Sequence, residues 1–222
     1  MLKISSTQLG LSPQATMNIA EKLYIKGFIT YPRTETTQYS STFDFIDNLN
    51  KFSDNKKFRK DVSELMESIN ENDSSILSGG TDAGDHPPIT PARNPRAGVL
   101  KGKELDLFEL ICQYYFASLS PDLEYENITY EFEVGDEVYD SSCSVIKKMG
   151  FLKFLSFQKK EFISDNEVLQ KNKKYIISDI SYEERKIENY ITEAELIEEM
   201  EKNHIGTDAS MSVHIANIVK RG

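Results

Sequence analysis

The sequence predicts an α+β protein with more than one domain, because its apolar residues change their spacing twice along the 222-residue chain. They recur at helical spacing as far as residue 120 and alternate with polar residues afterwards. Helical spacing returns near residue 191. We therefore expect a helical domain over residues 1–120, a β-rich segment over 121–190 and the start of another helical domain over 191–222.

Three helices are predicted in the first domain. Residues 13–26 form the first, with Pro13 at the first helical position, where its missing N–H is tolerated. The same spacing of apolar residues predicts helices over 57–71 and 103–120. Residues 72–103 are rich in glycine and proline and lack periodicity, which predicts a long loop. Loops of that length in a compact domain are usually functional or disordered.

The β-rich segment is predicted to begin with a strand around residues 128–134, where apolar and polar residues alternate. Gly135-Asp136 then offers a turn. Weaker strand candidates follow at residues 138–146, 151–157 and 174–182. The segment should therefore contribute strands rather than helices.

The composition excludes several classes of protein. A net charge of −10 excludes a uniformly basic nucleic-acid coat and a polybasic membrane-surface protein. No apolar run approaches the roughly 20 residues of a membrane span, and the first residues lack the apolar stretch of a secretory signal. The two cysteines and three histidines form neither a disulfide framework nor a zinc pattern, which indicates a reducing compartment inside the cell.

The first segment that carries chemistry is GFITYPRTETT, directly after the first predicted helix. Pro32 favours an extended backbone at Tyr31, and in an extended segment Tyr31 and Arg33 lie on the same face. A phenol has a pKa near ~10 and attacks poorly, but a neighbouring guanidinium favours the phenolate and binds phosphate. Thr34 and Thr36 add hydroxyl donors for phosphate oxygens. This chemistry suits attack on a phosphodiester, although a tyrosine beside proline can equally serve packing.

The second segment, TDAGDHPPITPAR, lies in the predicted loop. Pro87 and Pro88 restrict the backbone beside His86, so its side chain is held at low entropic cost. Asp85 or Asp82 could hydrogen-bond one ring nitrogen and leave the other for a phosphate or for proton transfer. The alternative is a turn with a solvent-exposed histidine.

The third segment is LIEEMEKNHIGTDAS. A capping box of Thr192 and Glu195 begins a helix that ends at Gly206, and Thr207 or Asp208 can cap the next one. Two short helices joined by a turn are typical of a helix-turn-helix motif. An ordinary helical hairpin fits the pattern better.

Together, and in this order, the three segments resemble the motifs of type IA DNA topoisomerases. The forms PRTET and DHPPITP are similar to the eukaryotic topoisomerase III branch, and GTDAS followed by Val213-His214-Ile215 is most similar to its beta member. The resemblance covers most of the chain and fades at residues 41–80 and 137–189. It implies a helical domain carrying a catalytic tyrosine, part of a β-rich arch, and the start of a helical domain that grips a single strand.

By this resemblance Tyr31 is the catalytic nucleophile, which attacks a single-strand phosphodiester, forms a 5′-phosphotyrosine and frees a 3′-hydroxyl. Arg33 stabilises charge on the phosphoryl transition state, and His86 assists at the scissile site. Religation reverses the attack, so strands pass through the break without ATP.

The expected contacts with DNA lie at five residues: Glu21, Thr34, Thr36, Thr207 and Ser210. Many relatives have a glutamine at position 21, and a glutamate there accepts hydrogen bonds but cannot donate one. Residues 1–40 and 80–103 each hold four Lys or Arg against two acids, a net charge of +2. A local cationic site for a single strand therefore fits within the acidic chain.

The resemblance places the family's Toprim domain, with its Mg²⁺-binding acidic cluster, before this region. We find no Asp-x-Asp in a βαβ context, so we expect a central fragment that binds no metal and is deficient in cleavage alone. The intact enzyme is expected to act on single-stranded DNA, with RNA as a further candidate substrate and an OB-fold or Tudor-type accessory protein as a candidate partner. We expect it in the nucleus, with the cytoplasm as a second location, and not secreted.

Two other functions remain open at this point. A non-catalytic paralogue would bind single-stranded nucleic acid without forming a covalent adduct. A tyrosine recombinase or type IB topoisomerase would form a 3′-phosphotyrosine and needs several Arg, His and Lys residues around its tyrosine. Tyr31 precedes the other motifs in the chain, which disfavours the second alternative.

Overall fold

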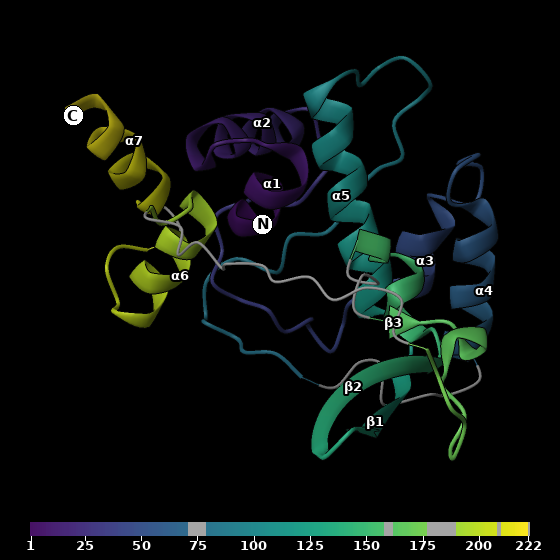
Figure 1. The fold of residues 1–222 in the computed structure, drawn as a ribbon. Coiled ribbons are helices and arrows are strands. Elements are labelled where there is room, and N and C mark those ends of the chain that lie inside the picture. The colour runs from purple at the N-terminus through teal and green to yellow at the C-terminus, as the bar shows by residue number, and fades with distance from the viewer. Residues whose placement is uncertain (71–78, 158–161, 177–189, 208–209, 222) are drawn as a thin grey trace. The chain divides into compact units, whose positions relative to one another are not determined.

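The computed structural model describes residues 1–70, 79–157, 162–176, 190–207 and 210–221. It confirms the mixed α+β class, with helices and one small sheet (Figure 1). The chain divides into two compact units, of which one is Met1–Ser120 with Ile191–Gly222 and the other is Pro121–Tyr190. The candidate domain over 191–222 thus joins the N-terminal helices in one unit here, and its role as the start of a strand-gripping domain stays a prediction.

The first unit begins with helices α1 (Leu2–Leu9) and α2 (Pro13–Ile25). The predicted helix over 13–26 is confirmed as α2. The Ser12 hydroxyl accepts a hydrogen bond from the backbone N–H of Ala15 at 3.3 Å, which satisfies one free donor of the first turn. The pattern did not predict α1, which contains mostly polar residues. Gly10 separates the two helices in a left-handed conformation, with φ of 61°.

Three further helices surround the aromatic core of this unit. They are α3 (Phe45–Asn50), α4 (Arg59–Asn70) and α5 (Lys103–Ser118). The predicted helices over 57–71 and 103–120 are confirmed, whereas the six-residue α3 was not predicted. Phe116 on α5 packs edge-on against Phe52 and Phe58, with ring centroids 5.8 and 5.2 Å apart. These rings anchor the scaffold that carries the candidate site.

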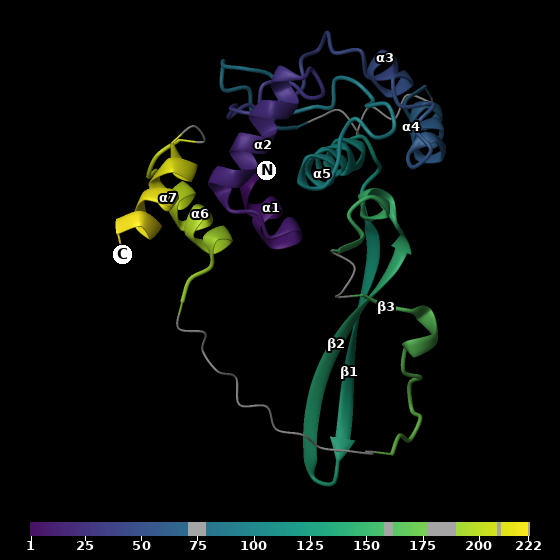
Figure 2. The ribbon, with the colours of Figure 1, turned by 90° about the horizontal axis from the view of Figure 1, so that it is seen from above.

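Helices α6 (Glu193–Lys202) and α7 (Met211–Arg221) complete the first unit. The predicted capping box is confirmed, with Thr192 and Glu195 each accepting from the other's backbone. Figure 2 shows both helices beside α1 and α2. The apolar side chains that join the four helices are Leu2, Met17, Ile197, Met200, Met211 and Ile215.

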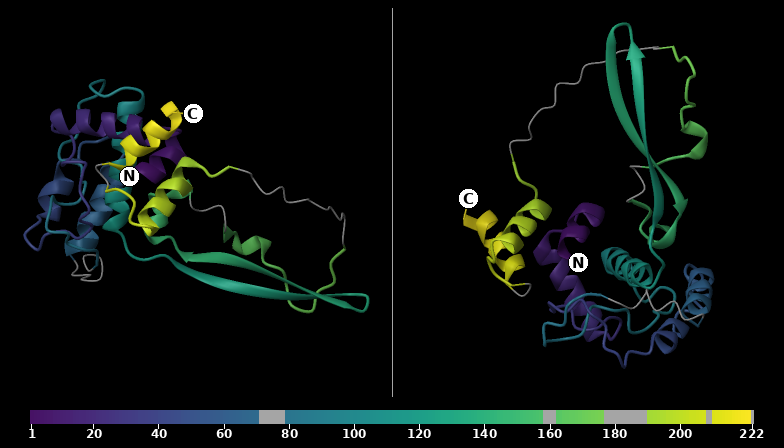
Figure 3. Two further views of the ribbon diagram at one scale, coloured as in Figure 1. Left: turned by 90° about the vertical axis from the view of Figure 1, so that its left-hand side faces the viewer. Right: turned by 90° about the horizontal axis from the view of Figure 1, so that it is seen from below.

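The second unit contains a long hairpin of β1 (Glu124–Val134) and β2 (Glu137–Lys148), visible in Figure 3. The strands predicted around 128–134 and 138–146 are confirmed, and both extend further. Gly135, with φ of 64°, provides the turn between them. A short strand β3 (Phe162–Ile163) pairs parallel to β2.

The strand predicted over 151–157 is wrong, because a 3-10 helix spans Gly150–Lys153. Gly150 turns the chain with φ of 46°, and a Cβ there would lie 2.3 Å from the carbonyl oxygen of Asp122. The turn buries Leu152 instead of exposing alternate residues. The candidate over 174–182 lies largely outside the described residues, and residues 174–176 are not in a strand. Among the helices that the structure describes, none has the length and apolar character needed to cross a bilayer.

Candidate active site

The segments of Tyr31 and His86, more than fifty residues apart in the sequence, meet at a short antiparallel contact. The Thr30 N–H donates to the carbonyl of Thr90 at 3.0 Å, and the Ala92 N–H donates to the carbonyl of Phe28 at 2.8 Å. The Thr30 hydroxyl donates to the carbonyl of Pro88 at 2.9 Å. These bonds fix the backbone directly before Tyr31 against the backbone directly after the two prolines.

The contact brings the rings of Tyr31 and His86 together. Their centroids lie 4.5 Å apart in an edge-to-face arrangement. Tyr24, at the end of α2, packs edge-on against Tyr31 with centroids 5.2 Å apart. Tyr31 is half-buried and His86 is exposed, so the pair lies at the surface of the helical unit. An imidazole beside a phenol can exchange protons with that phenol or with a group bound to it.

Arg33 is held by Glu21 on α2. Its Nε and Nη2 both donate to Glu21 Oε1, at 2.9 and 2.5 Å. The two side chains are 26% and 38% exposed, so they form an ion pair at the rim of the site rather than a buried one. The predicted contact of Glu21 with DNA stays a prediction, and the structure adds a role for this carboxylate as the partner of Arg33.

Thr34 and Thr36 both contact Asp85. The Thr36 hydroxyl donates to Asp85 Oδ1 at 2.6 Å, and the Thr34 hydroxyl lies 3.1 Å from the same oxygen. Hydrogen bonds to Asp85, above all from the Thr36 hydroxyl and then from the backbone N–H of Glu35, lower the pKa of this carboxyl group to about 2. The sequence suggested that Asp85 or Asp82 would bind the ring of His86. The structure instead places Asp85 on the Tyr31 segment and Asp82 on the backbone N–H of Gly84, at 2.9 Å.

Thr207 and Ser210 lie at the turn that leads into α7. The backbone N–H of Thr207 donates to the Ser210 hydroxyl at 2.9 Å, and the Ser210 N–H donates to the Thr207 carbonyl at 2.8 Å. A Cβ on Gly206 would lie 2.9 Å from the Ser210 Oγ, so this turn is tightly packed. These bonds are local to the helix start, and the predicted contact of both residues with DNA stays a prediction.

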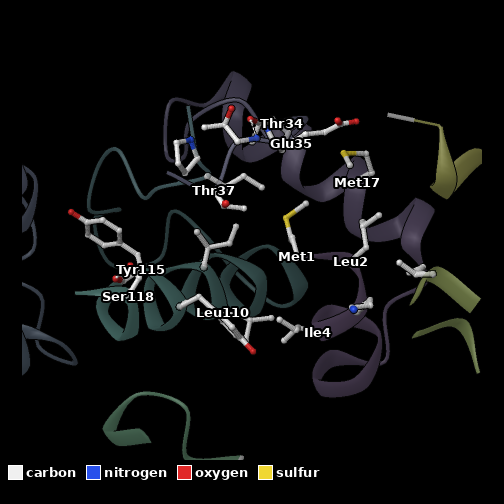
Figure 4. A pocket seen from close by; sticks show the side chains of 18 of the residues that line it. Met1, Leu2, Ile4, Met17, Thr34, Glu35, Thr37, Leu110, Tyr115 and Ser118 are labelled. Atoms are coloured by element: carbon white, nitrogen blue, oxygen red, sulfur yellow. Dashed lines mark hydrogen bonds between the residues drawn. The ribbon is translucent and has the colours of Figure 1, made fainter. Parts of the chain in front are cut away.

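A cavity of about 510 Å³ lies beneath the backbone of Thr34–Thr37 (Figure 4). Its wall includes Met1, Ile4 of α1, and Tyr115 and Ser118 of α5. The Tyr115 side chain is only 2% exposed, and burial raises its pKa. Burial also raises the pKa of Tyr39, whose hydroxyl pairs with Ser118. Both phenols are therefore poor candidates for a nucleophile.

Sequence reasoning missed three contacts of the site. Neither the packing of Tyr24 against Tyr31 nor the pairing of Glu21 with Arg33 was predicted. The contacts of Asp85 with the threonines join positions that lie 49 to 51 residues apart, so no local pattern could reveal them. The regular placement of hydroxyls at positions 34 and 36 was the one available indication, since it requires an acceptor somewhere.

The described residues bring no three His, Cys, Asp or Glu side chains together in a way that could hold a metal ion. We therefore derive no step through a metal from these residues.

Comparison with known proteins extends over the whole chain. The sequence model of a family described as DNA topoisomerase matches residues 1–222. The chain is 37% identical over 224 residues to mouse DNA topoisomerase 3-beta-1, a match that covers 100% of this chain and 25% of that protein. It is 37% identical to rice DNA topoisomerase 3-beta and 31% identical to Drosophila DNA topoisomerase 3-alpha, again over 100% of this chain, which corresponds to 25% and 17% of those proteins.

Among solved structures, full-length topoisomerase I from Thermotoga maritima has a similar fold, with a TM-score of 0.63 at 20% identity. The match covers 99% of this chain and 36% of that one. The chain thus spans about a quarter of the length of the curated 3-beta relatives that it matches.

Proposed function

Because the chain belongs to the type IA DNA topoisomerase family, we propose that it carries the nucleophile of a topoisomerase III-like enzyme. This enzyme cuts one DNA strand through Tyr31, holds the break as a 5′-phosphotyrosine, passes another strand and reseals the break without ATP. The observation that carries the proposal is the contact of the Tyr31 and His86 rings, whose centroids lie 4.5 Å apart, together with Arg33 two positions after Tyr31 in the chain.

In the cleavage step, Tyr31 Oη forms a bond to phosphorus while the bond from phosphorus to the 3′ oxygen breaks. The phenol loses its proton, and the departing 3′ oxygen gains one. His86 lies beside the phenol and is exposed to solvent, so its imidazole is suited to hold or hand over a proton there. Religation runs the same steps backwards, which returns the proton to Tyr31.

Arg33 contributes charge rather than proton transfer, because a guanidinium stays protonated at any physiological pH. Glu21 engages Nε and Nη2 of Arg33 through a single oxygen, which fixes the plane of the guanidinium two positions after Tyr31 in the chain. A planar guanidinium fixed beside the reacting phosphate stabilises the charge that develops on the phosphoryl oxygens. The ion pair with Glu21 thus serves orientation.

The wider properties of the enzyme belong to the same proposal and rest on its family. The enzyme depends on Mg²⁺ bound outside the described residues and acts on single-stranded DNA and also on RNA. It works with an OB-fold or Tudor-type accessory protein. It is located in the nucleus, with the cytoplasm as a second location. We also propose that this chain alone does not cleave DNA. Its coverage of a quarter of the relatives' length supports this point.

A chimera tests the proposal. This chain replaces the matching quarter of mouse DNA topoisomerase 3-beta-1, and relaxation of negatively supercoiled DNA is measured. Tyr31→Phe should abolish relaxation, whereas Tyr24→Phe, which alters the adjacent ring, should leave most of it. The 222-residue chain alone should show none. Relaxation at the parental rate by the Tyr31→Phe chimera would refute the assignment.

A further inference from the structure

We propose that Asp85 is a positioning residue whose carboxylate holds the segment of Tyr31 against the loop of His86 and thereby sets the contact between the two rings. Both of its oxygens are engaged by consecutive residues of the Tyr31 segment. Oδ1 accepts from the hydroxyl of Thr36 at 2.6 Å and lies 3.1 Å from the hydroxyl of Thr34, and Oδ2 accepts from the backbone N–H of Glu35 at 2.9 Å.

The two threonines also bond to the loop on either side of Asp85. The Thr36 hydroxyl accepts from the backbone N–H of Ala83 at 3.1 Å. The Thr34 hydroxyl contacts the backbone carbonyl of His86. Thr36 is buried, so its bonds are shielded from competing water. Asp85 therefore sits at the centre of a network that joins the two segments through both side chains and backbone.

The backbone of Thr37 also lies close to the backbone of Gly80 and Thr81, on the N-terminal side of the loop. This contact helps to hold the Tyr31 segment against the loop of His86. The Thr37 N–H donates to the carbonyl of Thr81 at 2.8 Å, and the Thr81 N–H donates to the Thr37 hydroxyl at 2.9 Å. A Cβ on Gly80 would lie 2.7 Å from the carbonyl oxygen of Thr37, which only glycine avoids. The loop thus lies directly on the Tyr31 segment. Along the loop, Asp85 comes after Gly80 and Thr81 and directly before His86.

His86 follows Asp85 in the chain and is exposed, so its position depends strongly on its backbone. Fixing the Asp85 carboxylate fixes that backbone one residue from the imidazole. The low pKa of Asp85, about 2, means that the carboxylate stays charged at neutral pH and keeps its acceptor role.

The network also determines whether the two threonines can donate hydrogen bonds to a DNA strand. A hydroxyl carries one proton, and the protons of Thr34 and Thr36 point to acceptors within the protein. While these bonds stand, the hydroxyls have no proton left to donate to a phosphate. We infer that they act on the reaction by placing Tyr31 and His86. That this placement of Tyr31 and His86 matters for catalysis rests on the proposed function. The coupling between Asp85 and the contact of the two rings does not.

The coupling can be measured in the 222-residue chain by nuclear Overhauser contacts between the ring protons of His86 and Tyr31. Asp85→Asn keeps the shape but loses the charge and one acceptor, and it should abolish these contacts while circular dichroism shows the same helices. Asp82→Asn is the matched control, because Asp82 bonds only within its own loop to the Gly84 N–H, among the bonds described here. It should leave the contacts intact.

A second variant distinguishes loss of the network from misfolding of Asp85→Asn. Thr36→Val has nearly the same volume and removes the short bond to Asp85, so it should weaken the same ring contacts. In the double variant with Asp85→Asn, the free energy of unfolding should fall by less than the sum of the two single losses, because both changes break one network. Ring contacts of wild-type intensity in folded Asp85→Asn or in Thr36→Val would overturn the proposal.

The chimera described above separates this proposal from the proposed function. There Asp85→Asn should lower kcat for relaxation about tenfold and leave single-strand affinity within about twofold, since it misplaces groups without removing them. Loss of the ring contacts together with an active Tyr31→Phe chimera would refute the function and leave the coupling standing. Intact ring contacts in Asp85→Asn together with an inactive Tyr31→Phe chimera would refute the coupling and leave the proposed function standing.

Discussion

Two nitrogens of Arg33, Nε and Nη2, donate to the same carboxylate oxygen of Glu21, at 2.9 and 2.5 Å. Glu21 projects from α2, whose position is fixed by buried residues such as Leu23 and Met17. The ion pair therefore holds the guanidinium of Arg33, two residues after Tyr31, against the rigid helix α2. The Glu21 carboxylate thus gives Arg33 a charged partner, which a neutral amide at position 21 would not provide.

Glu21→Ala is expected to release Arg33 and lower cleavage by the chimera about tenfold, through lost orientation. Because the pair is partly exposed, the free energy of unfolding should change by no more than about 1 kcal/mol. Oligonucleotide cleavage and urea unfolding measure the two effects. Glu104→Ala is the control, since it removes the comparable ion pair with Lys26, away from the tyrosine. Equal losses of activity in both variants would contradict the role of Glu21.

Arg33→Lys should lower kcat for relaxation about 10- to 100-fold, because lysine keeps the charge but cannot present a planar fork to a phosphate. The control is Arg93→Lys, in which the replaced guanidinium binds the carbonyl of Lys26 and lies over the ring of Phe28. That variant should retain most of the activity. A fully active Arg33→Lys chimera would show that charge alone is sufficient at this position.

The stability contributed by Asp85 should depend on pH in a defined direction. Its folded-state pKa of about 2 lies below the ordinary value of 3.8, so the carboxylate stabilises the fold above pH 3.8 and loses this contribution as the pH falls through 2. The wild-type chain should therefore be more stable than Asp85→Asn at pH 7. The difference should shrink steadily toward pH 2.

Urea unfolding of both chains at several pH values measures this dependence, provided that the chains remain folded at the lowest pH. A difference in stability that is independent of pH across this range would show that the amide disturbs the loop for another reason.

Gly80→Ala should disturb the candidate site more than Gly98→Ala. Both glycines have positive φ, 85° and 81°, so alanine brings a similar backbone strain of about 1 kcal/mol to each. Only at Gly80 does the new Cβ collide, at 2.7 Å from the Thr37 carbonyl oxygen, whereas the space around Gly98 is open. Nuclear Overhauser contacts between Tyr31 and His86 should weaken in the first variant alone. Equal effects would mean that the close approach does not support the ring pair.

The sequence was sufficient for elements whose cause is local. Ser12 caps α2, and the capping box of Thr192 and Glu195 begins α6, as expected from neighbouring residues. The failure at residues 151–157 also has a local cause, since Gly150 adopts a positive φ that periodicity cannot reveal. Helix α3 has only six residues and gives too little pattern to detect.

The candidate site was predictable in its residue types but not in its contacts. Tyr31 and Arg33 are neighbours in the sequence, and the resemblance to a family supplied His86 as their companion. The bonds of Asp85 cross about 50 residues, and their prediction would have required the antiparallel contact of Thr30 with Thr90. Sequence reasoning offered Asp85 or Asp82 as a partner for the imidazole of His86, whereas the fold turns the Asp85 carboxylate toward the threonines.

The most direct test of the account traps the covalent intermediate. A single-stranded oligonucleotide labelled at its 3′ end is incubated with the chimera, denatured, and digested for mass spectrometry. If Tyr31 is the nucleophile, the label is transferred to protein, the modified peptide carries a 5′-phosphate on Tyr31, and a 5′-labelled oligonucleotide transfers nothing. Transfer from the 5′-labelled strand, or an undiminished adduct in Tyr31→Phe, would contradict this role of Tyr31.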